Sequence, residues 1–136
     1  MRREYRFYVY ILTNYRKTVL YTGMTKDLVR RMIEHKFGFG SVFTCKYKLK
    51  YLVYFECYGY VDLAEAREKE LKGWRREKKE DLIKKENPLL LDLSPRIFRD
   101  SGYTNESLKI LADEIRRFYQ IDPSRGARDD KIRGSR

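Results

Sequence analysis

The pattern of apolar and polar positions predicts three β-strands in the first half of the chain. Residues 5–12 (YRFYVYIL) and 19–23 (VLYTG) are rich in β-branched and aromatic residues, and the polar segment TNYRKT separates them. Two such runs on either side of a short polar segment are typical of a β-hairpin. Residues 50–58 (KYLVYFECY) form a third run and predict a third strand.

One helical segment lies between the second and third predicted strands. Thr25 is a candidate N-cap for a helix over about residues 26–36, because its side chain can accept a hydrogen bond from the first turn. The sequence FGFGS follows, and its two glycines predict the end of this helix. The apolar face of the helix would consist of Leu28, Val29, Met32 and Ile33.

Two further helices follow the third predicted strand. Asp62 and Glu65 resemble a capping box and predict a helix over about residues 62–74. A helix over about residues 76–85 then ends before Pro88, because the residue preceding a proline disfavours the helical conformation. The element order is therefore β-β-α-β-α-α, which predicts a small α+β domain over residues 1–91. Its buried helical positions are predicted to include Leu63, Ala64, Leu71 and Trp74.

The last third of the chain has a different pattern. The segment after Pro88 is predicted to be mostly irregular until Thr104 or Asn105, either of which can cap a final helix that ends near Tyr119. One apolar stripe, which can dock on the domain or on a partner protein, is formed by Leu108, Leu111, Ile115 and Phe118.

These patterns predict a C-terminal extension with one amphipathic helix over residues 92–121. Residues 122–136 contain few apolar residues and predict a disordered basic tail. The folded domain would therefore come first, and the extension and the tail would follow it.

The charge balance favours an anionic partner. The chain has 31 Lys and Arg residues against 20 Asp and Glu residues, which gives a formal net charge of +11. Residues 1–91 contribute +9 of this charge and residues 92–136 contribute +2, so the excess belongs to the predicted domain. Aromatic residues make up 15% of the chain, and basic surfaces with aromatic side chains are used to bind nucleic acids.

The cysteines and the apolar runs indicate the class of protein. Cys45 and Cys57 form no CxxC motif, so a zinc site is not supported, and we expect reduced, mostly buried thiols. The N-terminal segment lacks the apolar run of a signal peptide, and no segment is long enough to span a membrane. These features predict a cytoplasmic protein.

Six short motifs occur in order between residues 8 and 88, and their order and spacing are more specific than any one of them. They are YVY (8–10), LYTG (20–23), DLVRRMIEH (27–35), YLVYFE (51–56), AREKELKGW (66–74) and KKENP (84–88). In these motifs the chain resembles the GIY-YIG nuclease domain. It is most similar to the small single-domain bacterial members, the YhbQ-like group, which are related to the N-terminal nuclease domain of UvrC. The resemblance implies a small three-stranded antiparallel sheet flanked by helices, in agreement with the predicted order.

The resemblance implies that Tyr10, Tyr21, Arg31 and His35 are catalytic. Arg31 and His35 are one helical turn apart and therefore share a side of the helix, whereas Arg30 points about 100° away from Arg31. An arginine suits this role, because its planar guanidinium matches phosphate oxygens and remains charged. A histidine in the position of His35 can relay a proton.

The resemblance also implies one metal ion, Mg²⁺ or Mn²⁺, held by a glutamate on the helix after the third strand. The motif KGW places this glutamate at Glu68, with Glu65 and Glu70 as rivals that helical periodicity alone does not exclude. A single carboxylate suits Mg²⁺, which keeps several waters and often takes only one or two protein carboxylates.

Gly23 and Asn87 are implied to have structural roles at the site. A side chain at position 23 would crowd the backbone or the phosphate, which favours glycine there. Asn87 corresponds to an asparagine near the active site in the family, but a simple helix stop before Pro88 explains it equally well.

The chain departs from the general family pattern at three positions. Tyr8 replaces a usual glycine, Thr22 replaces a usual isoleucine or valine, and Met24 stands where some members have a lysine that assists the general base. Lys26 lies close to that position. The identity of the base therefore stays open between the two tyrosines, with Tyr10 favoured.

Together these features predict a metal-dependent nuclease that hydrolyses DNA phosphodiester bonds, with RNA left open as a substrate. We see no recognition helix or second DNA-binding domain, so structure-dependent or non-specific cutting, in repair or recombination, is expected. The alternatives are a non-catalytic nucleic-acid-binding module and a nuclease subunit that a partner directs through the final helix. The basic residues expected to contact phosphates are Lys26, Arg30, Lys46, Lys48, Lys50, Arg75, Arg76, Lys78 and Lys79.

Overall fold

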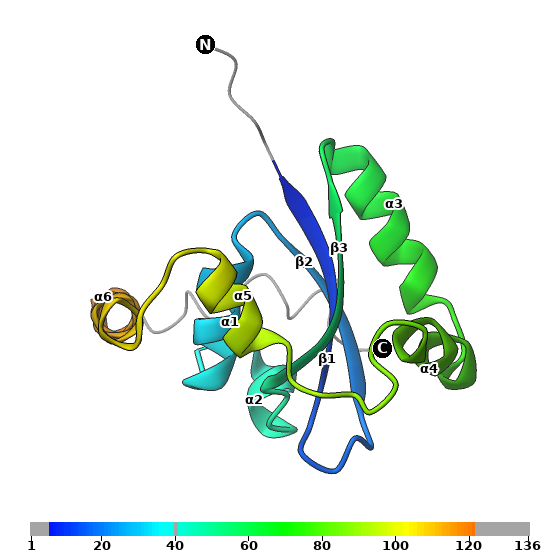
Figure 1. The fold of residues 1–136 in the computed structure, drawn as a ribbon, viewed down its shortest axis with the longest axis horizontal. Coiled ribbons are helices and arrows are strands. Elements are labelled where there is room, and N and C mark those ends of the chain that lie inside the picture. The colour runs from blue at the N-terminus through cyan, green and yellow to red at the C-terminus, as the bar shows by residue number, and fades with distance from the viewer. Residues whose placement is uncertain (1–5, 40, 122–136) are drawn as a thin grey trace.

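A three-stranded antiparallel sheet forms the centre of the protein in a computed structural model, which describes residues 6–39 and 41–121. Its strands are β1 (Phe7–Thr13), β2 (Leu20–Thr25) and β3 (Tyr51–Tyr58), in the order β2-β1-β3 (Figure 1). The predicted α+β class and the three predicted strands are confirmed. The tail predicted for residues 122–136 lies outside the described residues.

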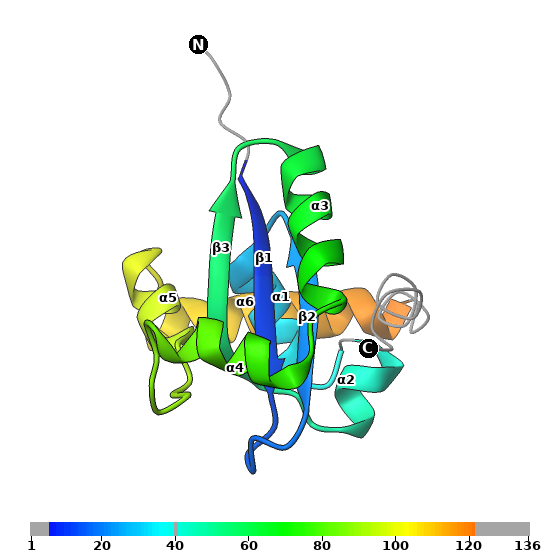
Figure 2. The same cartoon turned by 90° about the vertical axis from the view of Figure 1, so that its right-hand side faces the viewer.

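Helices cover both faces of the sheet, because its central strand is apolar on both. Val9, Tyr10, Ile11 and Leu12 are all fully buried, and alternate side chains of a strand point to opposite faces. One face carries Tyr10 and Leu12, and the helices on it are α1 (Leu28–Lys36), α2 (Val42–Lys46), α5 (Ser94–Asp100) and α6 (Asn105–Ile121). The other face carries Val9 and Ile11 and is covered by α3 (Val61–Lys72) and α4 (Arg76–Lys84), as Figures 1 and 2 show.

The predicted capping residues of two helices were wrong. Thr25 is the last residue of β2, and α1 is instead capped by Asp27, whose Oδ1 accepts a hydrogen bond of 3.1 Å from the backbone N–H of Arg30. Helix α3 begins after Tyr60, which makes no side-chain capping bond. Asp62 therefore lies inside the first turn, where a carboxylate still interacts favourably with the helix dipole.

The segment after Pro88 is more regular than the sequence predicted. Residues 94–100 form α5, with Pro95 at its start, where proline is favoured because its fixed φ suits the first turn. Asp92 anchors this helix to the domain. Its carboxylate accepts hydrogen bonds from the Ser94 backbone N–H and hydroxyl, from the Leu52 backbone N–H and from Lys36 Nζ.

Helix α6 packs on the domain, which is one of the two docking sites that the sequence left open for its apolar stripe. Thr104 caps it and accepts a bond of 3.1 Å from the Ser107 backbone N–H. The predicted stripe is buried at Ile115, but Phe118 remains 38% exposed, and Tyr119 is the buried aromatic residue instead. The stripe is therefore rotated relative to the prediction.

The prediction that the cysteines are mostly buried was wrong. Cys45 and Cys57 are both exposed, and they do not form a disulfide with each other. Cys57 lies on β3, an edge strand, and Cys45 lies on the short helix α2. Within the described residues, no helix is both long enough and apolar enough to cross a membrane.

Candidate active site

Three residues predicted to be catalytic lie together in the core. Tyr10 on β1, Tyr21 on β2 and His35 on α1 are each at most 3% exposed. The Tyr10 ring lies 6.5 Å from the Tyr21 ring and 5.9 Å from the His35 ring, and the Tyr21 and His35 rings are 6.3 Å apart, measured between centroids. Tyr10 Oη and His35 Nε2 are hydrogen-bonded at 3.2 Å. The hairpin and the helix thus bring together residues 25 positions apart.

Gly23 is opposite Tyr10 in the register of β1 and β2. A Cβ atom at this position would lie 2.6 Å from both Cζ and Oη of Tyr10, so the Tyr10 ring passes directly over the glycine. Glycine is therefore needed here because a neighbouring side chain occupies the space. The sequence had suggested crowding by the backbone or by a phosphate instead.

The environment of His35 keeps its imidazole neutral. Burial lowers the pKa of His35 to about 3, and the charge of Arg31 contributes to the same shift. Nδ1 of His35 is buried and has no hydrogen-bond partner among the described residues. An unsatisfied buried donor is rarer than an unsatisfied acceptor, so we infer that Nε2 carries the proton and donates to Tyr10 Oη.

Arg31 lies one turn before His35 on α1 and interacts with a buried acidic residue. Nη1 of Arg31 is 3.5 Å from Oε1 of Glu34, whose side chain is only 7% exposed. Nε of Arg30 is 3.4 Å from the other oxygen, Oε2. Sequence periodicity gave no signal for Glu34, because a glutamate on a basic helix ordinarily faces solvent.

The structure distinguishes Glu68 from its two rivals by burial. Glu68 is 5% exposed and shares the inner face of α3 with Ala64 and Leu71, whereas Glu65 and Glu70 are exposed. Lys72 Nζ is 3.4 Å from Glu68 Oε2. The prediction that Leu63 belongs to this face was wrong, since Leu63 is 52% exposed.

Glu68 offers a single buried carboxylate to a cation, and its charged neighbour is Lys72. No group of three or more His, Cys, Asp or Glu side chains that could enclose a metal ion occurs within the described residues. A single buried carboxylate is nevertheless typical of Mg²⁺ sites that water and substrate phosphates complete. Helix α3 runs beside β2 but covers the face of the sheet opposite to the one that carries Tyr10 and Tyr21 (Figure 2).

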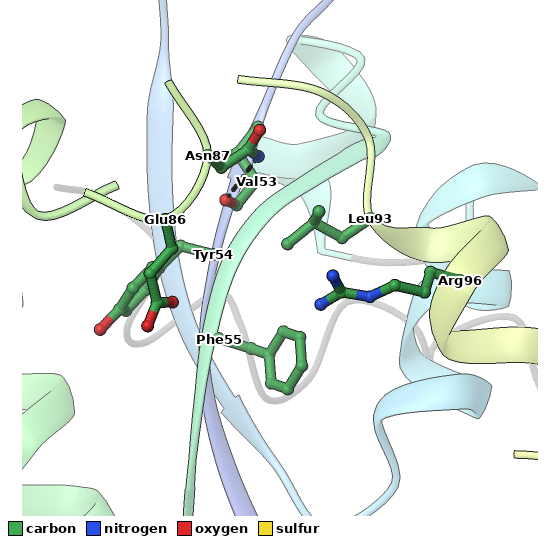
Figure 3. Close-up of a pocket in the computed structure, with 7 residues that line it drawn as sticks. All are labelled: Val53, Tyr54, Phe55, Glu86, Asn87, Leu93 and Arg96. Carbon is green, nitrogen blue, oxygen red and sulfur yellow. Dashed lines mark hydrogen bonds between the residues drawn. The ribbon is translucent and has the colours of Figure 1, made fainter. Parts of the chain in front are cut away.

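Asn87 holds the loop after α4 against β3. Its Nδ2 donates to the carbonyl oxygens of Val53 (3.0 Å) and Leu91 (2.8 Å), and its Oδ1 accepts from the Leu91 N–H (3.0 Å). Figure 3 shows Asn87 and Val53 at one end of a hollow of about 350 Å³ that Arg96 also lines. Asn87 therefore packs against β3, which β1 separates from the strand of Tyr21.

The basic residues predicted to bind phosphate differ in their availability. Arg76 is engaged, because its guanidinium donates to the carbonyl oxygens of Lys17 and Thr18 and to Glu80, each at 2.6 Å. These hydrogen bonds hold the start of α4 against the turn between β1 and β2. The exposed members of the set are Lys26, Lys46, Lys48, Arg75 and Lys78, whereas Arg30 and Lys50 are half-buried and Lys79 is buried.

Comparison with known proteins agrees with this arrangement. The family described as the GIY-YIG catalytic domain matches residues 6–81. A UPF0213 protein of Haloquadratum walsbyi is 43% identical over 75 residues, which cover 55% of this chain and 83% of the relative. A UPF0213 protein of Staphylococcus saprophyticus is 37% identical over 78 residues, which cover 57% of this chain and 94% of the relative. No solved structure is significantly similar.

The matched family region contains every element that carries the buried cluster. It ends within α4, before Asn87 and before the extension that contains α5 and α6. The three-stranded sheet, the Tyr10 ring packed over Gly23 and the matching region lead to one conclusion: the chain belongs to the GIY-YIG family, which is a family of nuclease type.

Proposed function

We propose that this protein is a metal-dependent nuclease that hydrolyses phosphodiester bonds in DNA. The observation that carries the proposal is the buried cluster of Tyr10, Tyr21 and His35 beside the guanidinium of Arg31. Such a cluster combines a proton acceptor with a fixed positive charge, and phosphodiester hydrolysis needs both.

Tyr10 is the general base in this mechanism. A tyrosine has an ordinary pKa near 10, so ionisation at neutral pH requires neighbours that stabilise the phenolate. A neutral His35 that donates Nε2–H to Tyr10 Oη provides one such interaction, and Arg31, whose charge acts on His35, supplies a positive charge beside the cluster. Tyr10 then takes the proton of the attacking water, and Tyr21 orients that water.

Arg31 stabilises the negative charge that develops on the phosphorane. The loss of one such preorganised group costs about 10²–10³ in rate. Its partner Glu34 balances the charge of the guanidinium in the resting enzyme.

Glu68 would hold the metal ion, Mg²⁺ or Mn²⁺, which when bound acts as a Lewis acid toward the phosphate and the leaving oxygen. Lys72 stabilises the ionised carboxylate of Glu68 from 3.4 Å. The burial of Glu68 on the inner face of α3 supports this assignment over the exposed Glu65 and Glu70.

The exposed lysines and arginines bind the substrate backbone without reading its sequence. Phosphate contacts of this kind fix the position of a nucleic acid but do not select bases. We therefore propose structure-dependent or non-specific cutting of DNA in the cytoplasm, in repair or recombination, with RNA as a second substrate class to be compared.

The test is a cleavage assay on single-stranded, duplex, flapped and branched DNA and on matching RNA, with Mg²⁺, Mn²⁺ or EDTA. We expect metal-dependent cutting that falls at least about 100-fold in both Arg31→Ala and Glu68→Gln. Glu65→Gln is the matched control, because it changes an exposed glutamate on the same helix. Tight binding without cutting by the wild-type protein would instead identify a binding module, and an equal loss in Glu65→Gln would remove the assignment to Glu68.

A further inference from the structure

The C-terminal helix reaches the candidate catalytic helix through a buried hydrogen bond. The hydroxyl of Tyr119 on α6 donates to Oε2 of Glu34 on α1 at 2.7 Å, although the two residues are 85 positions apart. Tyr119 is 8% exposed and Glu34 is 5% exposed. The matched family region ends at residue 81, so α6 is an addition of this chain to the matched domain.

The two oxygens of Glu34 have different partners. Oε2 accepts the Tyr119 hydrogen bond and also lies 3.4 Å from Arg30 Nε, whereas Oε1 faces Arg31 Nη1 at 3.5 Å. A carboxylate is planar, so holding Oε2 in place also sets the direction of Oε1. Tyr119, together with Arg30, thereby helps to set where the negative charge beside Arg31 is located.

The Tyr119 side chain is held at its hydroxyl by Glu34 and at its ring by Phe39. Its ring stacks on Phe39 at 5.0 Å between centroids with an interplanar angle of 5°. Next to it, the Phe118 ring lies 5.1 Å from the guanidinium of Arg30. Burial and the neighbouring carboxylate of Glu34 raise the pKa of Tyr119, so its hydroxyl keeps its proton and remains a donor at neutral pH.

We propose that Tyr119 and Glu34 are positioning residues of the nuclease site, through which helix α6 orients Arg31 for the phosphate. This inference rests on the proposed function. A group displaced by about 1 Å can cost about 100-fold in rate, and the loss of one anchoring bond is expected to displace Arg31 by less than that. We therefore expect Tyr119→Phe to lower kcat by about 10-fold.

The experiment compares Tyr119→Phe with a matched control in the full-length protein. Tyr119→Phe keeps the ring stacked on Phe39 and removes only the hydroxyl. Tyr58→Phe removes a similar bond, because the Tyr58 hydroxyl donates to Glu56 at 2.6 Å on the opposite face of the sheet. Measured on a cleaved DNA substrate, kcat should fall about 10-fold in Tyr119→Phe with KM changed less than twofold, and should be unchanged in Tyr58→Phe.

A double-mutant cycle tests whether Tyr119 acts through Glu34. Glu34→Gln preserves the shape and an acceptor oxygen, and it removes the charge that faces Arg31. If both residues act on Arg31 by the same route, the double variant should be no slower than the slower single variant. Additive losses in kcat, or a wild-type kcat in Tyr119→Phe at full folding, would overturn the proposal.

A second readout does not depend on cleavage. The Nε–H signal of Arg31 can be assigned in NMR spectra of the arginine side chains by its loss in Arg31→Lys. In Tyr119→Phe we expect this signal to shift and its exchange with solvent to become faster. The Nε–H signal of Arg67 is the control and should not change, because Arg67 Nε donates to Glu56 Oε1 at 2.9 Å. An unchanged Arg31 signal would refute the positioning role even if the protein cut no nucleic acid.

Discussion

The contact between Gly23 and Tyr10 gives a sharp test of the site geometry. In Gly23→Ala the new methyl carbon would lie 2.6 Å from Cζ and Oη of Tyr10 and 3.1 Å from Cε1. Non-bonded carbon atoms prefer about 3.5–4.0 Å, so the ring has to retreat by about 1 Å. Tyr10 is fully buried and bonded to His35 at 3.2 Å, so this retreat breaks the bond or forces the strands apart.

The expected magnitudes follow from this displacement. A shift of about 1 Å at a reacting group costs about 100-fold in rate. Overpacking of a filled core costs about 1–3 kcal/mol of unfolding free energy. Gly23→Ala should therefore lower both the cleavage rate and the free energy of unfolding measured by urea denaturation.

Gly59→Ala is the matched control, because a Cβ at Gly59 meets no atom within 4 Å. It should leave the cleavage rate unchanged. A wild-type rate and stability in Gly23→Ala would refute the argument. If glycine were required for phosphate approach instead, as the sequence suggested, Gly23→Ala would raise KM and leave the unfolding free energy unchanged.

Three further predictions concern stability. Because the pKa of His35 is lowered in the folded protein, the unfolded chain binds an extra proton below pH 6.5. The free energy of unfolding, measured by urea denaturation, should therefore fall by about 2 kcal/mol from pH 7 to pH 5. In His35→Gln this free energy should depend less on pH. Burial and the neighbouring Lys72 lower the pKa of Lys79, which makes no ion pair within the described residues, so Lys79→Met should raise the melting temperature; a fall would contradict this. Asn87→Ala leaves the carbonyl groups of Val53 and Leu91 without this partner and should lower the free energy of unfolding, measured by urea denaturation, by about 1–3 kcal/mol. A loss of kcat per folded molecule would instead support a catalytic role.

Local sequence patterns predicted the elements that carry the candidate site. The two strands of Tyr10 and Tyr21 and the helix of Arg31 and His35 follow from β-forming runs and helical periodicity, which depend on neighbouring residues. Helix α5 escaped prediction because the segment after Pro88 was predicted to be mostly irregular, whereas Pro95 lies in the first turn of this helix, where proline is favourable.

Capping and exposure were less predictable, because they depend on where each element ends and what lies against it. β2 continues to Thr25, so the cap passes to Asp27. Cys57 is exposed because its strand is at the edge of the sheet, which composition does not reveal.

The sequence by itself determined the family motifs, the order of the three strands and of helices α1, α3, α4 and α6, and the motif spacing that places Tyr10, Tyr21, Arg31 and His35, because these depend on spacing along one chain. Only the tertiary structure decided that Glu68 is buried while Glu65 and Glu70 are exposed. It also brought Tyr119 to Glu34 across 85 positions. Burial and contacts between distant segments depend on how helices pack on the sheet, and no local pattern contains that information.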